Sequence, residues 1–288
     1  MNNSIKKYPF KGGLSLEFEI VDLDDIFKHK KSMLIVPHRA QFYHVIWIER
    51  GKGTHYVDFN PINIEDNSII FVPNNSVNLF DKDGTYKGKS IIFTDSFFCK
   101  NQQDLQNLHS SLLYSDLYDV AQLKINPAYS DLKVLLNAMQ TEFSREQDAV
   151  QYGILHNLLH IFLLQSEREI RRQGFEEIKP SINLDYLMQF KNLLETNFRR
   201  ERSVNKYTSV LNLSEKQLHK ATTKLLDKTP KQLIDERVIL ESKRLLVHST
   251  MAVKEVAYEL GYDEPTNFIK YFRKHTALTP SEFREQYK

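Results

Sequence analysis

The C-terminal third of the chain contains a diverged internal repeat, which limits the fold more than any other feature of the sequence. Leu211 recurs as Leu260 after 49 residues, and Thr229 recurs as Thr279 after 50, each threonine followed by proline. Each copy has the pattern of a short helix, a tight turn of three or four residues and a second helix, which is the helix-turn-helix plan. The sequence therefore predicts an all-helical C-terminal domain with two such units, joined by a long helix over about 230–247.

Turn and capping residues support both units. Gly261 suits a position with positive φ in the second turn, and Asn212, the next most tolerant residue type, occupies the matching place in the first turn. Ser214 and Gln217 have the spacing of a capping box, in which each side chain bonds to the backbone of the other residue. Pro265 stands in the first turn of a predicted helix, where no N–H donor is needed. These local signals predict a helix start after each turn, as the repeat requires.

Two helices of the repeat, at about 214–226 and 265–275, have the composition of DNA recognition helices. A helix that enters the major groove presents the side chains of its first two turns to base edges and its N-terminal N–H groups to phosphates. The apolar Leu218, Phe268 and Phe272 are expected in the core. The outward-facing candidates for DNA contact are Lys216, Gln217, His219, Lys220 and Lys224 on the first helix, and Thr266, Asn267, Lys270, Arg273 and Lys274 on the second.

Simpler explanations exist for each of these signals taken alone. A single helical lysine is more often a solvated surface charge than a base-reading residue, by about three to one. Residues 180–288 carry 19 Lys and Arg against 14 Asp and Glu, a net charge of +5, while the rest of the chain has −3. A lysine-rich solvated domain can reach that charge without a polyanionic partner. Two capped units at a fixed offset are harder to explain in this way, so the duplication is the strongest evidence for DNA binding.

The repeat resembles the DNA-binding domain of the AraC/XylS family of bacterial transcription regulators. In the first copy the resemblance is carried by Leu211, Ser214, Leu218, Thr229-Pro230, Arg237 and Lys243-Arg244-Leu245-Leu246. In the second copy it is carried by Val253-Lys254-Glu255-Val256-Ala257, Leu260-Gly261-Tyr262, Phe268, Phe272-Arg273-Lys274, Thr279-Pro280 and Phe283-Arg284.

The resemblance implies a regulator of transcription that binds promoter DNA, in the first instance an activator with RNA polymerase as a partner. Its two recognition helices would enter successive major grooves one helical turn, or ~34 Å, apart. The base-facing residues that it implies are Lys216, His219 and Lys220 in the first unit, and Pro265, Thr266 and Lys270 in the second.

Three positions depart from the family's pattern. Thr222 stands where the family usually buries Phe, Asp227 where it usually has Gly, and Ala252 replaces the usual Ser cap before the second scaffold helix. The first unit is therefore expected to be less well packed, which makes base reading by Lys216 and His219 less firmly implied than base reading in the second unit.

Before the repeat, the sequence reads as short strands separated by turns. The segments 42–48 and 54–59, with Gly51 and Gly53 between them, predict a β-hairpin. Further strands are predicted at 68–72, 76–80 and 90–93. This spacing favours a small antiparallel sandwich or barrel, and the segment is similar to the cupin-like β-barrel sensor domain of the same family. The expected fold is therefore two-domain α+β: an N-terminal cupin-like β-barrel with following helices, and a C-terminal all-α domain.

Apolar residues recur at helical spacing over 131–146 and 150–171, where Ile154 and Ile161 are expected on the inward stripe. Such helices either cover an open side of a barrel or form a dimer seam, and periodicity does not decide between the two. The segment 171–180 contains Gly and Pro and breaks the pattern. The expected domains are a sensor and homodimerisation domain at 1–172 with helices at about 127–172, a linker at 173–180, and a DNA-binding domain at 181–288.

The predicted barrel holds the candidates for effector binding. Arg39, Trp47, His55 and Tyr56 would suit a small polar or anionic molecule if they line a cavity. A barrel filled by its own aromatic side chains fits the sequence about as well. In that case the protein would be a ligand-independent regulator whose barrel dimerises or binds a partner protein.

Enzyme chemistry is not favoured. Cys99 is the single cysteine and has no motif partner, so it is expected to be a small buried apolar residue. His38, His44 and His55 form no HxH pair of the kind that metal-binding cupins use, so no metal and no cofactor are expected, and a cupin enzyme is the least favoured alternative. The sequence shows neither a secretory signal nor an apolar run of ~18–20 residues, so we expect a cytoplasmic protein associated with the nucleoid.

Overall fold

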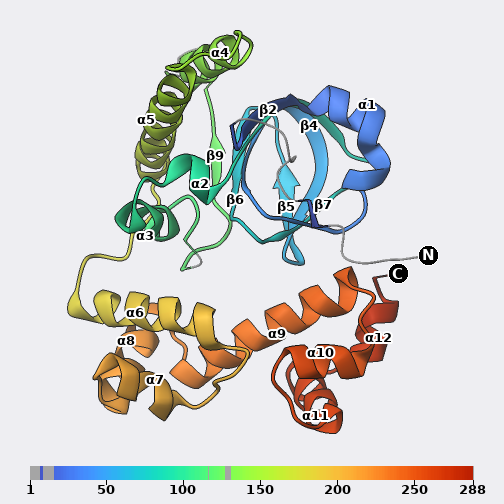
Figure 1. Cartoon of the computed structure of the whole chain (residues 1–288), viewed down its shortest axis with the longest axis vertical. Helices are drawn as coiled ribbons and strands as arrows, with labels where there is room; N and C mark the ends of the chain where they lie inside the picture. The colour runs from blue at the N-terminus through green and yellow to red at the C-terminus, as the bar shows by residue number, and fades with distance from the viewer. Residues whose placement is uncertain (1–6, 9–15, 116, 127–130, 288) are drawn as a thin grey trace. The chain divides into compact units, whose positions relative to one another are not determined.

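The computed structural model of the protein describes residues 7–8, 16–115, 117–126 and 131–287. The chain divides into two compact units, one within residues 6–177 and one within 178–288. The first unit is built on a β-sheet with helices on both faces, and the second is built from helices α6 to α12 (Figure 1). This confirms the prediction of an N-terminal sheet domain and a C-terminal helical domain.

The sheet of the first unit is centred on one long strand, β4. The first part of β4 pairs with β8 and β6, and its last residues pair with β5 and β7. The strands are β1 (Lys7–Tyr8), β2 (Phe18–Asp22), β3 (His38–Ala40), β4 (Tyr43–Val57), β5 (Asn60–Ile64), β6 (Ser68–Val72), β7 (Val77–Phe80), β8 (Thr85–Phe93) and β9 (Gln122–Lys124).

The cupin-like barrel is not confirmed, because the strand pairs of the described residues do not close into a ring. Strands β1, β2, β5 and β9 each pair with a single neighbour, so the sheet keeps open edges. The period-2 pattern of a strand reports that both faces can pack, but it carries no information on which edges meet. Whether the sheet closes into a barrel could therefore not be predicted from the sequence.

The predicted hairpin between 42–48 and 54–59 is wrong, because both segments belong to β4. Gly51 and Gly53 lie within this strand, just after a register shift between Ile48 and Arg50 against β8. A Cβ atom on Gly51 would lie 2.8 Å from the Thr85 carbonyl oxygen, so the glycine permits close approach of two strands and not a turn. The reversal occurs later, at Asp58 and Phe59, which have positive φ and connect β4 to β5.

Three helices interrupt the region that was predicted to form strands or loops. The first, α1, begins after Asp22, whose carboxylate accepts a hydrogen bond from the Asp24 N–H group at 3.0 Å. Its many charged residues hide an apolar stripe that packs on β8 and β2. These helices are α1 (Leu23–Leu34), α2 (Asp95–Phe98) and α3 (Gln102–Ser110).

Helices α4 (Asp131–Phe143) and α5 (Gln151–Arg172) lie on the face of the sheet opposite α1 (Figure 1). Together with that face they enclose a core that includes Trp47 and Phe162, whose ring centroids are 6.3 Å apart. The inward stripe of α5 is rotated relative to the prediction, since Ile154 and Ile161 are 38% and 46% exposed. Residues 127–130 of the predicted helical region lie outside the described residues.

The second unit follows the predicted helix plan closely. Its helices are α6 (Ile182–Asn197), α7 (Val204–Leu211), α8 (Glu215–Leu226), α9 (Pro230–His248), α10 (Val253–Glu259), α11 (Pro265–Thr276) and α12 (Pro280–Glu285). Helix α9 is the long connector between the two helix-turn-helix units, α7–α8 and α10–α11 (Figure 1). In the described part of the chain, no helix is long and apolar enough to cross a membrane.

Candidate nucleic-acid interface

The first helix-turn-helix unit has the turn and cap that its sequence predicts. Asn212 ends α7 in the left-handed conformation, with φ 54° and ψ 39°. At the start of α8, the Gln217 N–H group donates to the Ser214 hydroxyl at 3.2 Å, and the Ser214 N–H group donates to the Gln217 side-chain oxygen at 2.9 Å. The carboxamide oxygen of Gln217 is thus committed to the cap. Of the predicted DNA contacts, Gln217 is therefore the one with a clear structural role.

The second helix-turn-helix unit, α10–α11, repeats this plan with different residues. Gly261 has φ +75° in the turn after α10, and Pro265 is the first residue of α11. Phe268 and Phe272 are fully buried and fix one face of α11 in the core. The opposite face of α11 is consequently turned to solvent.

The predicted DNA-contacting residues lie together on the solvent side of the two second helices. Almost all are exposed; Pro265 alone is half-buried. On α8 they are Lys216, Gln217, His219 and Lys220, and on α11 they are Pro265, Thr266, Asn267, Lys270 and Lys274. Their contact with bases or phosphates stays a prediction.

The cations of these two faces differ from those of the connector helix. Lys231 of α9 pairs with Asp235 at 2.7 Å, and Lys228, just before α9, pairs with Glu236 at 2.9 Å. Within the described residues, no ion pair is formed by Lys216, Lys220 or Lys270. Uncompensated positive charge is therefore concentrated where a phosphate backbone would be met.

A buried charge network anchors the connector helix in the unit. The carboxylate of Glu241 is completely buried and accepts hydrogen bonds from the guanidinium groups of Arg199, at 3.1 Å, and Arg237, at 3.2 Å. Arg237 also forms a two-pronged pair with Glu195 of α6 at 2.6 Å and lies over the Phe198 ring at 3.8 Å. These pairs hold the pKa of Glu195 below its ordinary value against the opposing effect of burial. Breaking such a network strands a buried charge, so it fixes α6 against α9.

The segment between α6 and α7 also contacts the second helix-turn-helix unit, α10–α11, directly. The Arg202 guanidinium stacks over the Tyr262 ring at 3.6 Å and donates a hydrogen bond to the Leu260 carbonyl oxygen. Gly261 approaches the Arg199 carbonyl oxygen so closely that a Cβ atom would lie 2.0 Å from it. The two helix-turn-helix units are therefore connected at two places. One connection is α9, and the other is this contact between the α6–α7 segment and the turn after α10. Local sequence patterns carry no signal for this contact, because Arg202 and Leu260 are 58 residues apart along the chain.

The three departures from the family pattern are accommodated locally. Thr222 is fully buried, and its hydroxyl donates to the His219 carbonyl oxygen at 3.2 Å. Asp227 adopts the left-handed conformation at the end of α8, with φ 53°. The Ala252 N–H group donates to the Glu255 carboxylate at 2.6 Å, so the half of the capping box that needs no N-cap side chain is kept.

The predicted effector residues are not brought together. Trp47 packs in the core beneath α5, whereas His55 contacts Phe80, at 4.3 Å between ring centroids, in the separate core on the opposite face of β4. The His55 Nε2 atom lies 3.1 Å from the Asn78 side-chain oxygen, and burial lowers the His55 pKa to about 4. The Arg39 Nε atom donates to the Asn75 carbonyl oxygen at 3.0 Å. Tyr56, next to His55 on β4, points to the other side of the strand.

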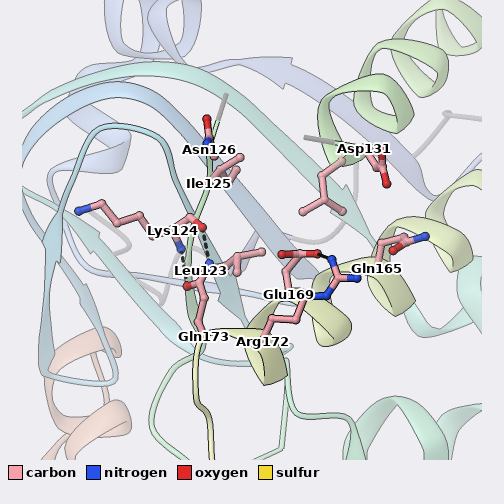
Figure 2. Close-up of a pocket in the computed structure, with 10 residues that line it drawn as sticks. Leu123, Lys124, Ile125, Asn126, Asp131, Gln165, Glu169, Arg172 and Gln173 are labelled. Atoms are coloured by element: carbon pink, nitrogen blue, oxygen red, sulfur yellow. Dashed lines mark hydrogen bonds and ion pairs between the residues drawn. The ribbon is translucent and has the colours of Figure 1, made fainter. Parts of the chain in front are cut away.

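A hollow of about 850 Å³ in the N-terminal sheet domain lies between β9 and the end of α5 (Figure 2). Four of its lining residues form two polar pairs. Gln173 exchanges two hydrogen bonds with the Lys124 backbone, at 3.3 and 2.5 Å, and Arg172 pairs with Glu169 at 2.5 Å (Figure 2).

The residues considered for enzyme chemistry are not arranged for it. No group of three or more His, Cys, Asp or Glu side chains among the described residues could hold a metal ion. Burial raises the pKa of the Cys99 thiol to about 11, so the reactive thiolate is disfavoured.

Comparisons with known proteins agree with the helix-turn-helix assignment. Residues 207–286 match the family described as "Helix-turn-helix domain". The HTH-type transcriptional activator RhaS of Enterobacter sp. (strain 638) is 22% identical over 253 residues, which cover 86% of this chain and 87% of that protein. RhaS of Salmonella agona is 23% identical over 254 residues, with the same coverage. The solved structure of ToxT from Vibrio cholerae O395 aligns with 94% of this chain and 100% of its own, at 18% identity and a TM-score of 0.45.

Proposed function

We propose that the chain is a DNA-binding regulator of the AraC/XylS type, as its repeat and its similarity to RhaS indicate, and that it recognises a specific double-stranded promoter sequence through α8 and α11. The relatives are transcription regulators and not enzymes. Each recognition helix would insert its N-terminal half into one of two successive major grooves, with α9 as the spacer.

The observation that carries this proposal concerns the second helix of each helix-turn-helix unit. The lysines of both helices face solvent and form no ion pair among the described residues. Lys216 and Lys220 on α8, and Lys270 on α11, are exposed and lie within the first two turns of their helices. That is the part of a helix that reaches base edges in the major groove. The contacts at α9 and Arg202 would hold the two helices at a fixed separation.

The remaining assignments follow from the same resemblance. We propose residues 1–172 as a sensor domain, 173–180 as the linker and 181–288 as the DNA-binding domain, in a cytoplasmic activator that acts with RNA polymerase. A small effector in the first unit would shift the balance between DNA-competent and incompetent arrangements. Homodimerisation would use the exposed apolar residues of α5.

The proposal is tested by selecting bound duplexes from a random pool and titrating the best sequence at several salt concentrations. We expect two short boxes about one helical turn apart, with an affinity at least ~10³-fold above random DNA. The affinity should fall steeply with salt, because phosphate contacts release counterions. Binding without sequence preference would contradict the assignment of α8 and α11 as base-reading helices, and absence of binding at low salt would overturn the function.

A further inference from the structure

Helix α9 is held by polar contacts on two opposite sides. On one side, Arg237 pairs with both carboxylate oxygens of Glu195 at 2.6 Å, and Glu195 belongs to α6, the helix that packs against α8. On the other side, the Asp235 Oδ1 atom accepts a hydrogen bond from the Tyr271 hydroxyl group of α11 at 2.8 Å. Residues two apart on an α-helix point in nearly opposite directions. Helix α9 is therefore tied to the first helix-turn-helix unit on one side and to the recognition helix of the second unit on the other.

Asp235 contacts α11 at two successive turns. Besides the bond from Tyr271, its Oδ2 atom lies 3.9 Å from the Nε2 atom of His275, four residues further along α11. Lys231, one turn earlier on α9, donates to Oδ1 at 2.7 Å, and the Asp235 side chain is only 13% exposed. Contacts at two turns fix the rotation of α11 about its axis as well as its distance from α9.

Tyr271 also lies where the segment before α7 reaches the second helix-turn-helix unit. The Arg202 guanidinium is 3.6 Å from the centroid of the Tyr262 ring and 6.0 Å from that of Tyr271, and the two tyrosine rings are 5.7 Å apart. At 100° per residue, Tyr271 stands beside Lys270 and Lys274 on the surface of α11. A change in the position of Tyr271 would therefore be passed on to the lysines that are predicted to contact DNA.

The relative placement of two recognition helices determines which DNA they can bind together. One base pair added between two boxes moves the second box by about 3.4 Å along the duplex and turns it by about 35° around the axis. Helices held at a fixed separation and rotation can meet the altered duplex only if DNA or protein deforms, which lowers the affinity. A side chain that fixes α11 on α9 would therefore decide which spacing is bound best.

We propose that Asp235, through its hydrogen bond with the Tyr271 hydroxyl group, is a positioning residue that sets the spacing between the two DNA boxes that the protein accepts. The inference rests on the proposed function, because it concerns how α8 and α11 bind DNA together. Neither Asp235 nor Tyr271 is assigned a DNA contact. Both act by placing Lys270 and its neighbours on α11.

The test compares the affinity of the full chain for its selected duplex with that for duplexes in which one base pair is added or removed between the boxes. The wild-type chain should prefer its own spacing by at least about tenfold. Tyr271→Phe removes one hydroxyl group and leaves Asp235 paired with Lys231, so the chain should fold. Its preference should fall below about threefold, since a hydrogen bond to a charged group contributes a factor of about ten or more. A general loss of stability would instead weaken binding of all three duplexes equally and leave the preference unchanged.

Further variants separate the hydrogen bond from other effects of substitution. Asp235→Asn keeps an oxygen that can accept from Tyr271 and should retain the spacing preference, whereas Asp235→Leu should lose it. Glu236→Leu and Tyr258→Phe, at exposed positions on α9 and α10, are the matched controls and should retain it. A preference retained in Tyr271→Phe or in Asp235→Leu, or lost in Asp235→Asn, would overturn the proposal.

A measurement without DNA keeps this inference distinct from the proposed function. In a Cys99→Ala background, spin labels on Lys224→Cys of α8 and Lys274→Cys of α11 report the distribution of distances between the two recognition helices. Tyr271→Phe should make this distribution at least about twice as wide, and an unchanged width would overturn the inference. Broadening in a chain that binds no specific duplex would uphold the contact and overturn the regulator. A wild-type chain that binds specifically but equally well at all three spacings would do the opposite.

Discussion

Lys270 is the single residue whose position best matches base reading. It lies in the second turn of α11, is exposed, and has no ion pair among the described residues, while Phe268 and Phe272 hold its helix in place. A lysine there can reach the acceptors of a guanine edge. We expect Lys270→Ala to cost about 1–3 kcal/mol at the selected duplex and to relax specificity at one base pair.

The measurement is competition binding against duplexes mutated at each position. Lys254→Ala, at an exposed lysine on the scaffold helix α10, is the matched control and should leave the base preferences unchanged. A loss that is uniform across all duplexes would assign Lys270 to the phosphate backbone instead.

The buried histidines give the first unit a stability that depends on pH. In the folded state burial lowers the pKa of His44 to about 3 and that of His55 to about 4, below the unfolded value of about 6.5. Below pH 6.5 the unfolded chain therefore binds protons that the folded chain does not, and stability falls as the pH falls. The loss should be on the order of 2 kcal/mol for each histidine at pH 5.

Urea unfolding between pH 7 and 5 measures this loss. Carboxylates with lowered pKa, such as Glu17 and Asp22, lose stability only below this window, so they do not obscure it. His44→Phe should remove one histidine's share of the slope, while His55 and His38, whose pKa burial also lowers, carry the rest. An unchanged slope in the variant would mean that other groups carry the effect.

At this scale the sequence was informative wherever the chemistry is local. The cap formed by Ser214 and Gln217, and the left-handed Asn212 and Gly261, could be predicted because their partners are a few residues away. The burial of His44 could not, since its surroundings come from six separate elements. The grouping of Trp47 with His55 failed for the same reason: residues on one strand can face different cores.

Among the elements, the turn between α10 and α11 is the one most constrained by its neighbours. Gly261 has φ +75°, and a Cβ there would lie 2.0 Å from the Arg199 carbonyl oxygen. Alanine would therefore add a steric clash with rigid backbone to the conformational cost of about 1–2 kcal/mol. We expect Gly261→Ala to destabilise the C-terminal helical unit by more than that conformational cost. It should also weaken specific DNA binding, because the contact between Gly261 and the Arg199 carbonyl oxygen also places Arg202 on Tyr262.

Gly174 provides a matched control for this substitution. Its φ is +86°, but no atom lies within 4 Å of a Cβ added there. Gly174→Ala should therefore cost only the conformational term. Thermal unfolding of both variants decides the question, and equal losses would show that the backbone at Arg199 yields without cost.

The helices of the C-terminal unit were more predictable than the strands and helices of the N-terminal sheet unit. Helices α8, α9 and α12 begin at residues whose side chains cap them, and α11 begins at a proline, so their starts can be read locally. The long strand β4 was read as a hairpin because Gly51 and Gly53 resemble a turn, whereas pairing with β8 makes them part of a bent strand. Helix α1 was missed, because its charged residues obscure the stripe that packs on β8.

For the molecule as a whole, the exposed face of α5 raises the question of how many copies bind DNA. Ile154, Ile161 and Leu164 are 38%, 46% and 55% exposed, although the other face of α5 is fully packed in the core. Apolar side chains repeated along an exposed helix are typical of a self-association seam. If α8 and α11 of each copy read DNA as proposed, a dimer would engage two bipartite sites, and its total affinity would gain from linking them.

We therefore expect Ile161→Glu to convert a dimer into a monomer in analytical ultracentrifugation, since a buried, unpaired carboxylate is incompatible with such a seam. Its affinity for a single bipartite duplex should stay within about twofold of wild type, while its affinity for a tandem pair of sites should fall at least about tenfold. Val210→Glu, at an equally apolar and 65% exposed position on α7, should leave the mass unchanged. A wild-type chain that is monomeric at the concentrations of the binding assay would rule out the seam. The exposed face of α5 would then be explained by contact with another protein, and operators would be read by one copy alone.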